Sequence, residues 1–144
     1  MGRVLCVDPG EKRIGLAVSD LSGTIANPLK VLEHISRTID AARIADLASE
    51  CEAGLIVVGQ PLDEDGQIGP QARKSQRLGE AIGLQTSTPV AYWDESGSTQ
   101  TARKARIEMG VSRDHRKGHM DDIAATVILQ TYLDAHPTLN GEQK

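Results

Sequence analysis

Acidic side chains lie at three separate predicted element boundaries in this sequence. Asp8 ends the first apolar run, Asp94 and Glu95 follow a later one, and Asp121 and Asp122 open the last helical segment. In open α/β sheets, chemistry gathers at the carboxyl ends of the strands, so these acids can converge on one edge. Each acid alone is explained equally well as a turn former, a helix cap or a partner of the helix dipole. Their joint occurrence at converging ends favours a shared site.

A cluster of carboxylates of this kind has a restricted chemistry. Two negative charges about 4 Å apart repel by roughly 4 kcal/mol at an effective dielectric constant of ~20. Three ionised carboxylates are therefore stable together only if cations neutralise them, and oxygen-only ligands favour Mg²⁺ or Mn²⁺ over zinc. A pair of such ions can activate a water and stabilise the leaving oxygen of a phosphodiester. The pattern predicts a metal-dependent nuclease.

A basic stretch directly precedes the last two acids. Between residues 103 and 119 the basic side chains are Arg103, Lys104, Arg106, Arg113, Arg116 and Lys117. With only two acids among them, this segment is strongly positive in a chain whose net charge is −4. A solvated helix face and loop would explain it equally well in isolation. Beside an acidic site, a surface that contacts phosphates is favoured, and we expect Arg103, Arg113, Arg116 and Lys117 to contribute to it.

The composition indicates a single globular domain. The chain has 144 residues, 39% of them hydrophobic, with one Trp, two Tyr and no Phe. So few aromatics argue against a protein that stacks single-stranded bases on aromatic rings. No apolar run approaches the ~20 residues of a membrane span, and the N-terminus reaches an acid too soon for a signal peptide, so we expect a cytoplasmic protein without membrane contact. Cys6 and Cys51 lack zinc-binding spacing and are expected to be small apolar residues.

The order of predicted elements indicates an α/β domain. Strands are expected at 4–8, 13–19, 24–33, 55–59 and 89–94, and helices at 36–51, 70–84, 98–109 and 120–135. The first three strands follow one another through short turns and should pair antiparallel, whereas the last two return through right-handed helical crossovers. We expect a five-stranded mixed sheet in the order 3-2-1-4-5, flanked by helices. Residues 1–136 would form the domain, with a polar loop at 110–119 and a flexible tail at 137–144.

Four motifs in this order resemble the YqgF/RuvX family, whose members are linked to Holliday junction resolution and to precursor rRNA processing. The motifs are DPGEKRIGLAVSD (8–20), IVVGQPL (56–62) with DG (65–66) and GP (69–70), DE (94–95) with ST (98–99), and DDIAA (121–125) with ILQTYL (128–133). They span nearly the whole chain, and their combination is far more specific than any one of them.

The resemblance implies a ribonuclease H-like fold, a RuvC-like active site and dependence on Mg²⁺ or Mn²⁺. It implies that Asp8 and Asp121 are catalytic metal ligands and that a third acid follows the fifth strand, where Glu95 matches. Strand alternation leaves the choice between Asp94 and Glu95 open, and Asp122 is better explained as an acid of the helix start. The implied substrates are four-way DNA junctions and the 5′ end of precursor 16S rRNA. A junction resolvase would usually be a homodimer because it cuts two strands symmetrically.

Two features near these motifs modify the expectation. Lys12 and Arg13 follow the first acid closely and either contact the scissile-strand phosphate or merely decorate a hairpin. The family usually has an Arg and an aliphatic residue after Asp-Glu, and here Ser96 and Gly97 take those places. The missing Arg removes a partner for a phosphate or carboxylate. Glu95 itself is retained.

Two other functions fit parts of the pattern. Some relatives of this fold lack the acids and act as non-catalytic nucleic-acid-binding modules, but here all three acids are present. Sugar kinases and actin-like ATPases share the sheet and a similar first loop, but they enclose a nucleotide between two such domains. A chain of 144 residues supplies only one. A metal-dependent nuclease is the function that the sequence favours.

Overall fold

The computed structural model describes residues 2–61, 68–94 and 113–136, with the course of the backbone alone for 113–122. The elements in chain order are β1 (Arg3–Pro9), β2 (Arg13–Ser19), β3 (Ala26–Glu33), α1 (Arg37–Glu50), β4 (Ala53–Gln60), α2 (Pro70–Gln85), β5 (Val90–Asp94) and α4 (Arg113–Ala135). Every strand lies within two residues of its predicted bounds. The helix predicted at 98–109 and the tail at 137–144 fall outside the described residues and stay predictions.

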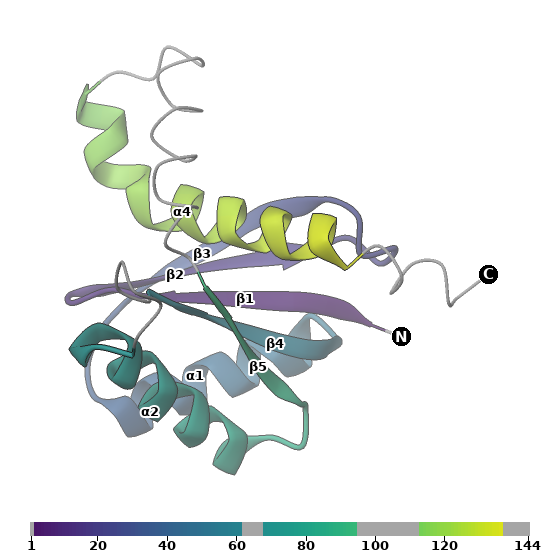
Figure 1. Cartoon of the computed structure of the whole chain (residues 1–144), viewed down its shortest axis with the longest axis horizontal. Coiled ribbons are helices and arrows are strands. Elements are labelled where there is room, and N and C mark those ends of the chain that lie inside the picture. The colour runs from purple at the N-terminus through teal and green to yellow at the C-terminus, as the bar shows by residue number, and fades with distance from the viewer. Residues whose placement is uncertain (1, 62–67, 95–112, 137–144) are drawn as a thin grey trace.

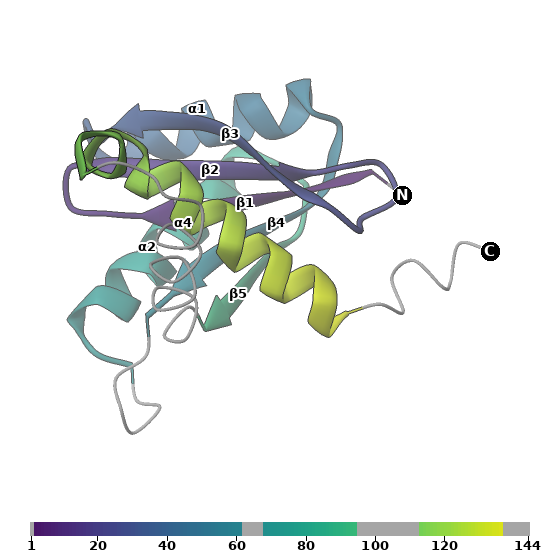
Figure 2. The same ribbon diagram turned by 90° about the horizontal axis from the view of Figure 1, so that it is seen from above.

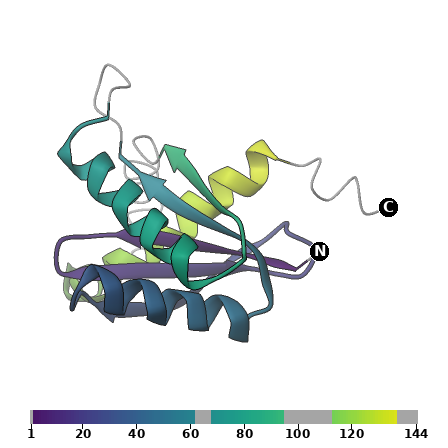
Figure 3. The same ribbon diagram turned by 90° about the horizontal axis from the view of Figure 1, so that it is seen from below.

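The five strands form one mixed sheet in the order β3-β2-β1-β4-β5, which confirms the predicted topology. β1 pairs antiparallel with β2 and parallel with β4, and β4 pairs parallel with β5. Helices α1 and α2 cover one face of the sheet and α4 covers the other, as Figures 1 and 3 show. The molecule is therefore a three-layer α/β domain with β1 at its centre.

The central strand is apolar on both faces because each face packs against helices. Leu5 and Val7 belong to the core cluster shared with α1 and α2. Val4 and Cys6 belong to the second cluster, shared with α4. This alternation explains the unbroken apolar run that the sequence shows. It also assigns a face of the sheet to each residue that follows along β1.

Helices α1 and α2 begin where the sequence predicts, for different physical reasons. The Oγ atom of Ser36 accepts a hydrogen bond from the backbone N–H of Ile39 at 3.2 Å, which satisfies one of the unpaired donors of the first turn. Pro70 occupies the first turn of α2, where its lack of an N–H costs nothing. Both helices are thereby fixed at the end of the sheet where β1 terminates (Figure 3).

Helix α4 begins earlier than the sequence indicates. The polar loop expected at 110–119 is wrong from Arg113 onward, because the backbone is helical from there. Arg, Lys and Met favour helix, and extending an existing helix carries no nucleation cost, so the segment needs no apolar face of its own. Among the described residues, no helix has the length and apolarity that crossing a bilayer requires.

One side of α4 packs on the sheet at regular helical spacing. The buried residues of this side are Ala125, Ile128, Leu129, Tyr132 and Leu133. Their contacts with the Val4–Cys6 face of β1 fix the depth at which the helix lies. Polar bonds at the two edges of the sheet then fix its position along the strands.

At the β3 edge, Gln130 is bonded to the backbone in both directions. Its Oε1 atom accepts from the N–H of Ala26 at 2.9 Å, and its Nε2 atom donates to the carbonyl of Thr24 at 2.9 Å. At the β5 edge, the indole N–H of Trp93 donates to Thr131 Oγ1 at 3.0 Å. The Trp93 ring also meets the Tyr132 ring edge-on, with centroids 5.3 Å apart. Helix α4 is thus held at both edges.

A buried carboxylate fixes the corner between β3 and α1. Asp40 is 1% exposed and accepts hydrogen bonds from the backbone N–H of Ile35 at 3.1 Å and from Arg43 at 2.7 Å. Its second oxygen is paired with the Nδ1 atom of His34. Burial raises the pKa of Asp40, but the bonds from Ile35, His34 and Arg43 outweigh it and hold the pKa below 3.8.

We expect Gln130→Ala to lower the free energy of unfolding by about 1–2 kcal/mol, because two backbone groups lose their partners. Chemical denaturation would measure the change, and hydrogen exchange would locate it at the β2–β3 turn and α4. Gln85→Ala is the matched control, since Gln85 is exposed at the end of α2. Equal stability of the two variants would contradict the role of Gln130.

We expect Asp40→Asn to lower the free energy of unfolding by about 1–3 kcal/mol near neutral pH, because a buried acceptor of three hydrogen bonds loses its charge. The pKa of Asp40 is depressed in the fold, so its contribution is present above the unfolded-state value near 3.9 and is lost as pH falls through the folded-state value. The difference between the variant and wild type should therefore shrink below about pH 4. Urea denaturation across pH would test this, and a difference that stays constant with pH would refute it.

Candidate nuclease site

Asp8 lies at the carboxyl end of the central strand. It is opposite Gly15 of β2, and its neighbour Val7 is opposite Val58 of β4. Because Cys6 faces α4, alternation places Asp8 on the α4 face as well. Its side chain is half-buried. Asp8 is therefore the first acidic residue of β1, at the point where the cover of apolar side chains ends.

Asp94 lies at the same end of the sheet but on its other face. Trp93 packs against α4, whereas the hydroxyl of Tyr92 donates to the carbonyl of Gln76 on α2 at 3.1 Å. Alternation along β5 therefore places Asp94 on the α2 face, where it is exposed. Asp94 does not share a face with Asp8. Glu95, the other candidate for the third acid, lies outside the described residues.

Asp121 and Asp122 both belong to α4, for which the structure gives only the backbone at these positions. Asp121 lies one helical turn before Ala125, which is buried against the sheet. Figures 1 and 2 show the first half of α4 at the end of the sheet where β1 terminates. The backbone thus brings the Asp121 segment to the same end and the same face as Asp8.

The donor chemistry of the expected ligands is purely carboxylate. Asp8 has a described side chain, whereas those of Asp121 and Glu95 fall outside the described set. Among the described side chains, no group of three acids, histidines or cysteines is close enough to hold a metal ion. Oxygen donors alone suit Mg²⁺ or Mn²⁺ and do not suit zinc.

The expected phosphate contacts lie on two segments. Lys12 and Arg13 are exposed at the β1–β2 turn, which the hydrogen bond from the N–H of Gly10 to the carbonyl of Arg13 closes at 2.9 Å. A Cβ atom on Gly10 would lie 2.6 Å from that carbonyl oxygen, so the turn requires glycine there. The other expected contacts, Arg113, Arg116 and Lys117, lie in the first turns of α4, and Arg103 is outside the described residues.

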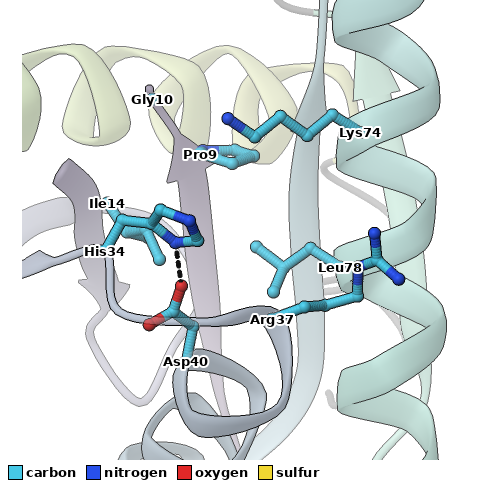
Figure 4. A pocket seen from close by; sticks show the side chains of 8 residues that line it. All are labelled: Pro9, Gly10, Ile14, His34, Arg37, Asp40, Lys74 and Leu78. Atoms are coloured by element: carbon cyan, nitrogen blue, oxygen red, sulfur yellow. Dashed lines mark hydrogen bonds and ion pairs between the residues drawn. The ribbon is translucent and has the colours of Figure 1, made fainter. Parts of the chain in front are cut away.

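A pocket of about 190 Å³ lies on the other side of the same turn (Figure 4). Its lining residues are Pro9, Gly10, Ile14, His34, Arg37, Asp40, Lys74 and Leu78. None of the polar side chains among them was singled out by the sequence. They come from the β3–α1 connection, α1 and α2, and no spacing along the chain indicates that they meet. Only the packing of both helices against the end of β1 brings them together.

Comparisons with known proteins agree with this architecture. A family model described as RuvX, Holliday junction resolvase, matches residues 2–135. A protein of Thermoanaerobacter pseudethanolicus named "Putative pre-16S rRNA nuclease" is 42% identical over 134 residues, covering 92% of this chain and 96% of the relative. A protein of the same name from Clostridioides difficile is 38% identical over 133 residues, covering 92% and 94%.

Solved structures show the same fold at lower identity. The RuvC protein of T. thermophilus in complex with a Holliday junction substrate has a TM-score of 0.60 and 17% identity, over 96% of this chain and 98% of that one. The fowlpox virus Holliday junction resolvase has a TM-score of 0.57 and 13% identity, over 92% and 99%. These likenesses confirm the RuvC-like fold. Since the family model spans nearly the entire sequence and relatives of about 40% identity cover most of it, the chain belongs to the RuvX family of Holliday junction resolvases.

Proposed function

We propose that this protein is a metal-dependent endonuclease in which Asp8, Glu95 and Asp121 hold two divalent ions. The observation that carries the proposal is the position of Asp8, at the carboxyl end of the central strand and on the face that α4 covers. Asp121 lies on that helix, one turn before a residue buried against this face. The function rests on two acids from opposite ends of the chain that the fold brings to one end of one face.

The residues fit Mg²⁺ or Mn²⁺ because all the proposed donors are carboxylate oxygens. Such ions, when bound, supply an activated water and stabilise the charge that develops on the leaving oxygen. The protein itself supplies rigidity. β1 pairs with β4 as far as Val7 and with β2 through Asp8, so the Asp8 backbone is anchored at the edge of a regular sheet. A fixed carboxylate needs no reorganisation during the reaction.

Alternation along β5 supports Glu95 as the third acid. Every second residue of this strand faces α4, as Trp93 does. The next residue in that series is Glu95, whereas Asp94 belongs to the opposite series. We therefore assign Glu95 to the site and exclude Asp94 from it. Asp122 remains an acid of the helix, outside the set of ligands.

Basic side chains around the acids would bind the phosphate backbone. The proposed contacts are Lys12, Arg13, Arg103, Arg113, Arg116 and Lys117. Lys12 and Arg13 are exposed beside Asp8, so a bound strand can approach them from solvent. Cations here also offset the repulsion between the carboxylates and an anionic substrate.

We favour precursor 16S rRNA over junction DNA as the substrate. The relatives that share 38–42% identity over most of this chain are named for that RNA. The solved junction resolvases share only 13–17% identity, which supports the fold and not the substrate. Sedimentation with and without a four-way junction would measure the oligomeric state, which is a second way to distinguish the two substrates. A homodimer is expected if the junction is the substrate.

We expect Asp8→Asn to reduce cleavage at least about 100-fold, equivalent to about 2.7 kcal/mol of transition-state stabilisation, because a metal-binding charge is lost. Labelled precursor rRNA and a labelled four-way junction would be incubated with Mg²⁺, with Mn²⁺ and with a chelator. Asp46→Asn is the matched control, since Asp46 is an exposed acid on α1. Cleavage that persists in chelator, or in Asp8→Asn, would leave a non-catalytic nucleic-acid-binding module as the better explanation.

We expect Glu95→Gln to lose cleavage as Asp8→Asn does, and Asp94→Asn to keep cleavage within about threefold of wild type. The reason is that adjacent residues of a strand face opposite sides of a sheet. Rates with saturating Mn²⁺ would be compared for the two variants. A larger loss in Asp94→Asn than in Glu95→Gln would show that the third acid was assigned wrongly.

A further inference from the structure

The pocket behind the β1–β2 turn carries an excess of positive charge. Figure 4 shows His34 and Lys74 on either side of Pro9, Leu78 between α1 and α2, and the guanidinium of the lining residue Arg37 beside α2. The acid in its lining is Asp40, whose two oxygens already accept from Ile35, His34 and Arg43. Arg43 balances the charge of Asp40 from outside the pocket lining. The charge that an incoming ligand would meet is therefore that of the cations.

The two permanent cations of the pocket have no charged or hydrogen-bonding side-chain partner within the described part of the chain. Neither Lys74 nor Arg37 has an ion pair or a side-chain hydrogen bond there. Lys74 is half-buried, and in Figure 4 its side chain extends away from α2 so that its ammonium group lies above Pro9. A lysine held partly out of solvent without a carboxylate partner is a ready donor for an anion.

His34 contributes a third polar group to the pocket. Its Nδ1 atom is paired with Asp40, which fixes the orientation of the ring. The Nε2 atom is turned away from Asp40 and lies toward the pocket (Figure 4). The ring is 37% exposed, so a ligand can reach it from solvent. The buried carboxylate therefore has a second effect besides closing the β3–α1 corner, because it orients the histidine.

The size of the pocket limits what can bind. About 190 Å³ is less than the roughly 300 Å³ at which sites for drug-sized molecules begin, so a whole nucleotide does not fit. No Phe, Tyr or Trp lines it, and a stacked base is not favoured. A phosphate group, with several acceptor oxygens and negative charge, matches the size and the donors.

We propose that this pocket binds one backbone phosphate of the nucleic-acid strand, on the face of the sheet opposite Asp8. The inference rests on the proposed nuclease function and adds a second contact point to it. Pro9 and Gly10 line the pocket and directly follow Asp8, so a strand crossing this turn contacts both places. Arg73 and Arg77, exposed on α2 beside Pro70, extend the basic surface away from the turn.

Binding without metal tests the pocket separately from catalysis. Inorganic phosphate, and then a short oligonucleotide, would be titrated in chelator into wild type, Lys74→Gln and Arg37→Gln, with amide shifts followed by NMR. We expect shifts at His34 and Lys74, about tenfold weaker phosphate binding in each variant, and a salt dependence of oligonucleotide binding reduced by about one unit. Lys30→Gln, which removes an exposed charge from β3, should behave as wild type.

The proposed phosphate site would be refuted if Lys30→Gln and Lys74→Gln weakened phosphate binding equally, or if neither variant weakened it. Weaker binding of inorganic phosphate with unchanged oligonucleotide binding would mean that the ligand is a small free phosphate, and the backbone assignment would fall. Cleavage assays keep the two proposals apart. Lys74→Gln should raise KM about tenfold with kcat unchanged, and Asp8→Asn should lose cleavage but keep Lys74-dependent binding. If the wild-type protein bound the oligonucleotide through Lys74 but did not cleave it, the proposed nuclease function would be refuted. The proposal that the pocket binds phosphate would then remain.

Discussion

Both faces of β1 are buried, and this burial governs how the other elements of the domain are arranged. A strand covered by α1 and α2 on one side and by α4 on the other carries apolar side chains from Val4 to Val7. Polar groups can appear only where this cover ends, and that point is Asp8. The position of the acid is therefore a consequence of the core. The same packing restrains its backbone, and this restraint suits the metal-binding role proposed for Asp8.

The docking of α4 links the two ends of the chain. Gln130 and Trp93 fasten the helix at opposite edges of the sheet, and the buried side between them sets its depth. The backbone position of Asp121 follows from these contacts, because it lies on the same helix. A nuclease site assembled in this way depends on long-range packing, so substitutions far from the acids can weaken it.

The turn after Asp8 separates two kinds of chemistry. On the α4 face the proposed carboxylates would hold cations, whereas on the α1–α2 face Lys74 and Arg37 present cations of the protein itself. A nucleic-acid strand that crosses the turn would meet both. The overall negative charge of the chain does not prevent this, because binding follows the local distribution of charge.

The strands and their order in the sheet could be predicted from the sequence, because apolar runs indicate burial and the short turns and helical crossovers restrict how the strands pair. The sequence placed the start of α4 too late, because the polar segment Arg113–Met120 has too few apolar residues to show a helical period. Alternation along the predicted strand left the choice between Asp94 and Glu95 open, although the family resemblance favoured Glu95. The contacts of Tyr92 with α2 and of Trp93 with α4 then separated the two faces of β5. The pocket around Lys74 was decided by tertiary structure alone. Its cations come from segments far apart in the chain, and only packing, which local spacing does not encode, brings them together.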